Sequence, residues 1–171
     1  IFRMTFPTAL EDFLAWLTAT PIAVTVRENE VLFPWIESVH VLAIVLVVGT
    51  ISIVDMRLLG WASLDRAVTR LMRDVLPWTW GAFAIAVVTG SLLFSSRAPD
   101  YAHNFFFQGK MVLLVVAGLN MALFHAIGIG NVAAWDTSRA TPAAARVAAG
   151  VSLTLWITVI AFGRWIGFTL Q

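Results

Sequence analysis

Four long apolar stretches are the feature that most constrains the fold of this chain. Each has about the 20 residues that an α-helix needs to cross the hydrocarbon core of a bilayer. They are Pro34–Leu59, Val75–Phe94, Phe106–Ile129 and Ala148–Leu170. Short connections join successive stretches, which favours antiparallel neighbours. The sequence therefore predicts an all-α integral membrane protein whose residues 34–171 form a four-span antiparallel bundle.

The composition supports a membrane location. Hydrophobic residues make up 60% of the 171 residues and charged residues only 12%, about half of the roughly 25% that is usual in soluble domains. A folded chain of this size has too much surface for its volume to hide so many apolar side chains. Those side chains must face lipid, so an ordinary soluble globular domain is excluded.

Several function classes are excluded as well. The chain has no cysteine, which removes disulfides, thiolate metal sites, covalent haem attachment and cysteine nucleophiles. Its net charge is only +1, so it lacks the basic footprint of a nucleic-acid-binding protein. The expected partners are the lipid bilayer and either other membrane subunits or further copies of the chain.

Prolines are expected at the starts of the spans and not inside them. Pro34 opens the first span, Pro77 the second, and Pro142 precedes the fourth. Proline suits the first turn of a helix because its missing N–H would be unpaired there anyway. Tryptophans near the predicted ends are typical of an interfacial belt: Trp35, Trp61, Trp78, Trp80, Trp135 and Trp165.

Residues 1–33 form a separate N-terminal interfacial segment. Thr8 and Glu11 have the spacing of a capping box, which predicts a helix start. Apolar side chains then recur at helical spacing, at Leu10, Phe13, Leu14 and Leu17. Thr20 and Pro21 end this helix after about ten residues, too few to cross a bilayer. We therefore expect an amphipathic helix that lies on the membrane surface.

Basic residues in the loops set the expected orientation. One side of the membrane carries Arg57, Arg66, Arg70, Arg73, Arg139 and Arg146, and the other carries Arg3, Arg27, Arg97 and Lys110. Cytoplasmic loops carry the excess of basic residues. Both termini are therefore predicted to lie outside the cytoplasm.

Ionisable side chains within the spans are costly in lipid and each needs a reason to be there. On the first span, Glu37, His40 and Asp55 share one helical face, because Glu37 and Asp55 are five helical turns apart. We expect this face to point into the bundle. Lys110 and His125 lie in the third span and Arg164 in the fourth.

The depths of these groups predict two polar levels. The outer level contains Glu37, His40, Lys110, Met111 and Arg164, and the inner level contains Asp55, Arg57 and His125, with Asn120 between. At 1.5 Å per residue, His40 and His125 are about 20 Å apart along the membrane normal. A single haem held by these two histidines is therefore not expected.

Haem at one level is the cofactor that these residues suggest. His40 would be an axial ligand near the outer surface, with Met111 or His103 as the second ligand, because haem iron accepts a His/Met pair. His125 would serve a haem at the inner level. Lys110 and Arg164 would neutralise the haem propionates.

The same residues also have structural or metal-binding interpretations. Glu37 paired with Arg164 or Lys110 would be a buried ion pair, and His40 could hydrogen-bond between helices. Glu37 and His40 match half of a di-iron carboxylate signature. His125 would be structural or interfacial.

Gly163 and Gly167 form a GxxxG pattern that permits close helix contact, within the bundle or with a partner. Arg164, between the two glycines, favours a side that faces protein. At the inner rim, Asp55 and Arg57 would anchor the end of the first span.

Several strings run through most of the chain: Trp35–His40, Val54–Gly60, Pro77–Trp80, Thr89–Gly90, Lys110–Asn120, His125 and Gly163–Arg164. They resemble an uncharacterised bacterial family of small four-helix integral membrane proteins, which implies the bacterial cytoplasmic (inner) membrane. More distantly, His40 with the following apolar run and Gly49 is similar to the first helix of CopD-type copper-resistance proteins and of the membrane protoporphyrinogen oxidase. Those likenesses imply four-helix bundles that handle haem or metal.

Three functional hypotheses follow. The first is a b-type cytochrome-like subunit in which His40 ligates haem b near the outer surface for electron transfer. The second is a cofactor-free accessory subunit that packs against a larger membrane complex. The third is a metal or proton pathway along the face that carries Glu37 and Asp55.

Overall fold

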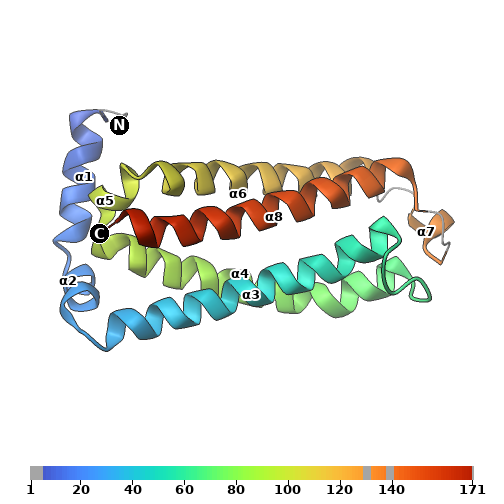
Figure 1. Cartoon of the computed structure of the whole chain (residues 1–171), viewed down its shortest axis with the longest axis horizontal. Helices are drawn as coiled ribbons and strands as arrows, with labels where there is room; N and C mark the ends of the chain where they lie inside the picture. The colour runs from blue at the N-terminus through green and yellow to red at the C-terminus, as the bar shows by residue number, and fades with distance from the viewer. Residues whose placement is uncertain (1–5, 129–131, 138–140, 171) are drawn as a thin grey trace.

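The computed structural model describes residues 6–128, 132–137 and 141–170. Four long helices run side by side (Figure 1): α3 (Leu32–Leu59), α4 (Val68–Ser96), α6 (Phe105–Leu123) and α8 (Ala143–Thr169). All four are long and apolar enough to cross a membrane. The 28 residues of α3 extend for about 42 Å, more than the hydrocarbon core of about 30 Å. The predicted all-α integral membrane fold is confirmed.

The spans pack as two antiparallel pairs. Helix α3 lies against α4, α6 lies against α8, and the contact of α3 with α8 joins the pairs. Along the described residues, the backbones of α4 and α6 stay apart, although the ring of Phe94 in α4 stacks on that of Phe107 in α6 with the centroids 5.2 Å apart. Side chains in the middle of the spans face outward, such as Leu42 at 68% exposure and Val112 at 62%. So extensive an apolar exterior is expected of a protein that lipid surrounds.

Short elements connect the spans. Helix α5 (Ala98–Ala102) leads from α4 to α6, and α7 (Val132–Trp135) precedes α8. Helix α6 ends in a π-helical turn, η1 (Phe124–Gly128), so the third span changes geometry before its predicted end. That predicted end, Ile129, lies outside the described residues. Helix α8 begins at Ala143, directly after Pro142, and not at the predicted Ala148. The predicted start marked only the beginning of the apolar stretch.

The N-terminal segment contains two helices where the sequence predicted one. Helices α1 (Thr8–Thr18) and α2 (Pro21–Glu28) meet at an angle of 62°, and together they also pass the length and composition test for a bent span. Helix α1 crosses the end of the bundle where the C-terminus lies (Figure 1). This position is compatible with the expected interfacial helix.

The predicted capping box is wrong. Pro7 occupies the N-cap position of α1 and Thr8 is already helical, so no side chain caps this helix. Thr20 does end α1, but it also starts α2, because its hydroxyl oxygen accepts a hydrogen bond of 3.4 Å from the N–H of Ala23. Within the predicted apolar stripe of α1, only Leu14 is buried.

The second span begins about two turns earlier than predicted. Helix α4 starts at Val68 and not at Val75, so Pro77 lies inside it. Pro34 likewise lies within the first turn of α3, where proline is tolerated. Pro34 therefore opens its span as predicted, whereas the expectation that Pro77 opens the second span is wrong. Helix α4 can begin before Pro77 because a residue far along the chain caps its first turn.

Asp136, which follows α7, supplies that cap. Its carboxylate accepts two hydrogen bonds from Thr69, one from the backbone N–H at 2.8 Å and one from the hydroxyl at 2.6 Å. The backbone N–H of Val68 also donates to the Asp136 carbonyl at 3.2 Å. These bonds fix the start of α4 from a segment far along the chain.

Arg57 holds the same end of the bundle together. Its side chain is fully buried; Nε donates to the carbonyl of Arg66 at 2.9 Å, and a terminal nitrogen donates to the carbonyl of Asp136 at 3.5 Å. An apolar cluster surrounds this end: Leu58, Val68, Val132, Trp135, Ala145 and Ala149. Arg57 therefore anchors the end of α3, as the structural interpretation expected.

Candidate functional site

His40 lies in a polar contact between α3 and α4. Its Nδ1 is 3.0 Å from the hydroxyl oxygen of Thr89, and that hydroxyl lies 2.7 Å from the carbonyl of Ile85, to which it donates. A hydroxyl has one proton, so Thr89 accepts from His40. This assignment from the hydrogen-bond network places the imidazole proton on Nδ1. In the neutral ring, Nε2 then carries the lone pair.

Gly90 makes this position of the imidazole ring feasible. A Cβ atom added at Gly90 would lie 2.9 Å from Cε1 of His40, closer than two carbon atoms pack without displacement. Any larger residue at position 90 would push the ring away. The sequence analysis noted Thr89 and Gly90 only as part of a resemblance. The spacing of residues within one span could not predict that Thr89 and Gly90 face His40 on another helix.

Lys110 comes from α6, on the other side of the bundle interior. Its charge acts directly on His40, and its Nζ lies 3.7 Å from the position that a Cβ at Gly163 would occupy. Gly163 of α8 therefore leaves room for the lysine side chain. The structure thus brings together His40 and Lys110, two members of the predicted outer level.

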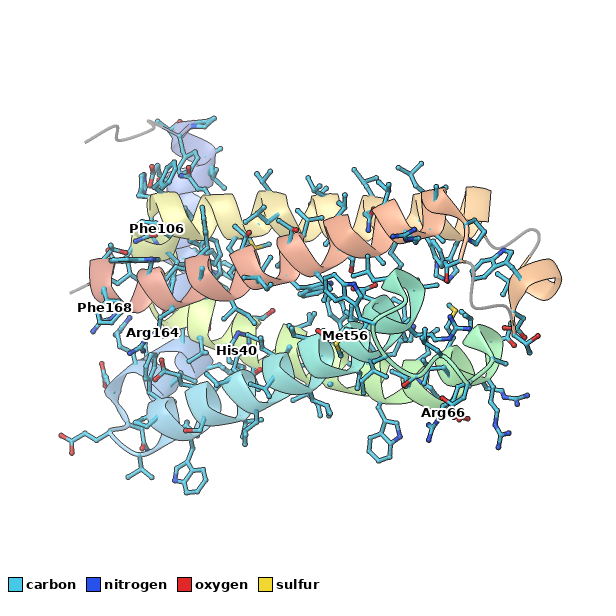
Figure 2. The ribbon with its side chains drawn as sticks, turned by 45° about the vertical axis from the view of Figure 1, so that its right-hand side comes forward. His40, Met56, Arg66, Phe106, Arg164 and Phe168 are labelled. Carbon is cyan, nitrogen blue, oxygen red and sulfur yellow. The ribbon has the colours of Figure 1, made fainter. Side chains whose placement is uncertain are left out.

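Three other members of that level point elsewhere. Met111 is 47% exposed, so it faces away from the interior that the adjacent Lys110 enters. Arg164 is exposed and its guanidinium lies over the ring of Phe168, 4.7 Å from the ring centroid. Figure 2 shows this pair nearer the terminal end of the bundle than His40. Arg164 therefore does not face the interior of the bundle, because Gly163 provides the inward face of this turn.

Glu37 is also exposed. Along the described residues, it makes no ion pair with Lys110 or Arg164. Its charge acts on Tyr101 of α5: burial first, and the Glu37 carboxylate second, raise the pKa of the Tyr101 phenol. The predicted inward face of α3 therefore includes His40 and Asp55 but not Glu37.

The other two histidines are held by local contacts. His103 Nε2 lies 2.9 Å from a carboxylate oxygen of Glu11 in α1, and its Nδ1 lies 2.8 Å from the carbonyl of Pro99. Both ring nitrogens are thus engaged. His125 is exposed, with Nδ1 2.8 Å from the carbonyl of Met121 in its own helix. Neither joins His40.

Metal-binding clusters are not found in the described part of the chain. No group of three or more His, Cys, Asp or Glu side chains there could hold an ion. Glu37 and His40 are one turn apart on α3, but Glu37 is exposed while His40 is partly buried. Among the described residues, the fold therefore brings no further ligands to Glu37 and His40 that would complete a di-iron site.

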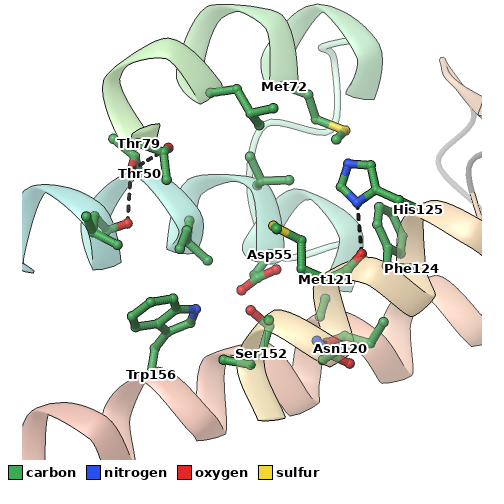
Figure 3. Close-up of a pocket in the computed structure, with 18 of the residues that line it drawn as sticks. Thr50, Asp55, Met72, Thr79, Asn120, Met121, Phe124, His125, Ser152 and Trp156 are labelled. Carbon is green, nitrogen blue, oxygen red and sulfur yellow. Dashed lines mark hydrogen bonds between the residues drawn. The ribbon is translucent and has the colours of Figure 1, made fainter. Parts of the chain in front are cut away.

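A second polar region lies deeper in the bundle, around a pocket of about 310 Å³ between α3, α4, α6 and α8. Asp55 of α3 is only 6% exposed, and its Oδ2 atom has no hydrogen-bond partner among the described residues. Ser152 of α8 lies beside this carboxylate (Figure 3). Figure 3 shows Asp55, Ser152 and Trp156 around the pocket, with His125 near its other side. The sequence analysis placed Asp55 at the rim and missed Ser152 and Trp156.

Comparison with protein families gives one result. A family of unknown function, DUF6644, matches residues 14–169. The chain belongs to the DUF6644 family. Neither a curated protein nor a solved structure matches it. The family match covers all four spans, so the resemblance to an uncharacterised family of small membrane proteins is confirmed at that level.

Proposed function

We propose that the protein is a haem b-binding, b-type cytochrome-like membrane subunit in which His40 is the axial ligand. The observation that carries this proposal is the presence of the Lys110 charge near His40 inside the bundle, with the histidine ring fixed by Thr89 and Gly90. The ring is held at Nδ1, so Nε2 keeps the lone pair that an iron ligand requires.

The hydrogen bond at Nδ1 would also set the character of the ligand. A histidine that ligates a metal donates its other ring N–H to a fixed acceptor, which fixes the tautomer and orients the ring. Thr89 supplies that acceptor, and its own proton is directed to Ile85. The three groups form a chain of hydrogen bonds from the proposed ligand to the backbone of α4.

Lys110 supplies a cation for a haem propionate. A buried carboxylate needs a charge-assisted partner, and the Lys110 side chain reaches the bundle interior beside Gly163. Arg164, the other candidate, stacks on Phe168 at the exterior. We therefore assign the propionate role to Lys110 alone.

The donor set fits a haem with a single axial histidine from this chain. Of the predicted second ligands, His103 is engaged at both nitrogens and Met111 faces outward. A bound haem would supply one-electron redox chemistry. The residues of this chain would hold it, orient it and keep its propionate paired.

The absorption spectrum of the protein tests this proposal. Protein purified in detergent from haem-supplemented cells is expected to show a Soret band. If His40 is the one ligand that this chain gives to the haem, that band would also change on adding carbon monoxide to the reduced form. His40→Ala should lose the band, whereas His125→Ala, the matched control, should keep it. A colourless wild-type protein, or an unchanged spectrum in His40→Ala, would contradict the proposal.

A role as an accessory subunit is the second candidate. Gly167, the second glycine of the GxxxG pattern, has no atom within 4 Å of an added Cβ, so this part of α8 is open to another helix. We propose that a membrane subunit or a further copy of the chain packs there. Cross-linking from a cysteine placed at Gly167 in native membranes tests it; the absence of any cross-linked species would contradict it.

We propose that the protein lies in a bacterial inner membrane with both termini outside the cytoplasm. Both termini lie at one end of the bundle, and Arg66 lies at the other (Figures 1 and 2). An excess of basic residues marks the cytoplasmic side. A reporter fused after Gln171 that is active only in the periplasm should be active, and a cytoplasmic reporter should not.

A proton or metal pathway along the face of α3 has weaker support. Asp55 is buried but Glu37 is exposed at the other end of the helix. Glu37→Gln in liposomes should leave ion uptake unchanged if no such pathway exists. A loss of uptake in that variant would revive it.

A further inference from the structure

We propose that the pocket around Asp55 binds a small lipid-soluble aromatic molecule carrying a hydroxyl group, of the phenol or quinol class. This site is distinct from His40, which does not line the pocket. The inference therefore stands without the proposed haem. It rests on one unpaired polar atom, on the character of the pocket wall and on the route by which a ligand would reach it.

The unpaired atom is Oδ2 of Asp55. A buried polar atom without a hydrogen-bond partner is rare in native proteins and calls for an explanation. The residue is 6% exposed, and among the described side chains and backbone none bonds to this oxygen. Ser152 lies beside the same carboxylate at the pocket (Figure 3). A ligand that donates one hydrogen bond would satisfy it.

A hydroxyl group is the best match to this carboxyl group. A carboxylate only accepts hydrogen bonds, and a protonated carboxyl group both donates and accepts. A hydroxyl can serve either form, since it donates one bond and accepts others. Nearby Asn120 gives its amide N–H to the carbonyl of Ala148 at 3.0 Å, so its side chain is already held in place.

The remaining wall is mostly apolar and contains aromatic rings from α4, α8 and η1. Trp80 and Phe83 of α4, Phe124 of η1 and Trp156 of α8 line the pocket. Aromatic rings favour offset or edge contacts with another ring. The volume of about 310 Å³ lies at the small end of the range of about 300–1,000 Å³ for small-molecule sites. These features favour one or two fused rings.

The pocket is reached from the lipid. Its wall includes residues of both α4 and α6. The backbones of these two helices stay apart along the described residues, and the stacked rings of Phe94 and Phe107 join them outside the pocket lining. The side chains around them are exposed and apolar, such as Val112 and Val115 of α6. A molecule dissolved in the bilayer can therefore enter between α4 and α6, whereas a water-soluble one would have to cross lipid first.

Binding of 1-naphthol to the protein in lipid nanodiscs tests the inference. The matched probe is 1-methoxynaphthalene, which has the same rings but no hydrogen-bond donor, and empty nanodiscs correct for partition into lipid. We expect 1-naphthol to bind at least tenfold more tightly than the methoxy compound, measured by titration calorimetry. Equal affinities, or no binding of either compound, would overturn the proposal.

Three variants locate the site. Asp55→Leu should remove the preference for 1-naphthol while keeping the Soret band, which separates this site from the proposed haem. Gly118→Leu should block binding of both probes, because Gly118 lines the pocket and an added Cβ there meets no atom within 4 Å. Gly49→Leu is the matched control: its Cβ position is equally open, but it does not line the pocket.

A cationic ligand is the alternative to a hydroxyl ligand in this pocket. An ionised Asp55 could instead pair with an ammonium group. The probe 1-naphthylmethylamine distinguishes the two, since its rings are the same and it is charged at neutral pH. Tighter binding of this amine than of 1-naphthol would overturn the assignment of a hydroxyl ligand, as would an unchanged 1-naphthol preference in Asp55→Leu.

Discussion

Two polar regions of the same helix differ in how their groups are satisfied. At the loop end of α3, Arg57 is fully buried and donates to the carbonyls of Arg66 and Asp136. Two residues earlier, Asp55 is also buried, but one of its oxygens faces a pocket and has no partner among the described residues. Arg57 thus links the end of α3 to two other segments, whereas Asp55 has an oxygen that can still accept a hydrogen bond from a ligand.

The His40 region resembles Asp55 more than Arg57. His40 uses one ring nitrogen to bind Thr89 and keeps the lone pair of the other, and the cation of Lys110 lies nearby without a carboxylate partner in the described part of the bundle. Burial of polar groups in lipid therefore has two uses in this chain. Groups that bond to the backbone of other segments, as Arg57 does, should affect stability. Groups that direct an acceptor atom to a pocket, as Asp55 does, should affect ligand binding more.

Arg57→Met should have the largest effect on stability. The change removes the side-chain donor to the Arg66 carbonyl and one of two donors to the Asp136 carbonyl, which keeps the N–H of Val68. An unsatisfied buried polar group costs about 1–3 kcal/mol. We expect the free energy of unfolding, measured in mixed micelles, to fall by about 3 kcal/mol. Arg66→Met, at an exposed side chain, is the matched control and should change it by less than about 0.5 kcal/mol. Similar losses in both variants would remove the contrast between the two regions.

Gly90→Ala should have a smaller effect on stability and a clear effect on retention of the proposed haem. The new methyl group would lie 2.9 Å from Cε1 of His40, and overpacking of this kind costs about 1–3 kcal/mol. The ring must move from Thr89, so we expect at least a tenfold loss of bound haem. Gly81→Ala on the same helix meets no atom within 4 Å and should retain haem. If both variants retain haem, the fixed ring is not needed for binding.

Much of the fold could be predicted from the sequence because it depends on local composition. The four spans, their antiparallel order and the end of α1 at Thr20 follow from apolar length and from breaker residues. The early start of α4 could not be predicted, since its cap, Asp136, lies 67 positions away from Thr69. The sequence analysis placed the start of the second span near Pro77, but the Asp136 cap starts α4 at Val68, so that Pro77 lies inside the helix.

The sites were predictable only in part, for a geometric reason. Depth along the membrane normal can be counted in residues, and it correctly brought His40 and Lys110 to one level. Rotation about each helix axis depends on contacts between helices. That rotation turned Met111 and Glu37 outward and brought Ser152 to Asp55, and no single span's pattern specifies it.

Asp136→Ala should have the smallest effect, and one that depends on pH. The hydrogen bond from the Thr69 hydroxyl, followed by that from its backbone N–H, lowers the pKa of the Asp136 carboxyl group. A lowered pKa stabilises the folded state above the unfolded pKa of about 3.9, and this stabilisation is lost as the pH falls through the folded value.

At pH 7 the loss of the cap should therefore cost about 1 kcal/mol, a modest amount because the carboxylate is well exposed to solvent. Unfolding in mixed micelles at pH 7 and at pH 3 measures the difference between wild-type protein and the variant. The gap should narrow at the lower pH, where the carboxyl group becomes protonated and accepts hydrogen bonds more weakly. Asp65→Ala, which removes a carboxylate from the same end of the bundle without a bond to Thr69, is the control. A gap that stays constant with pH would mean that Asp136 fixes the start of α4 through its backbone contact with Val68 and not through its charge.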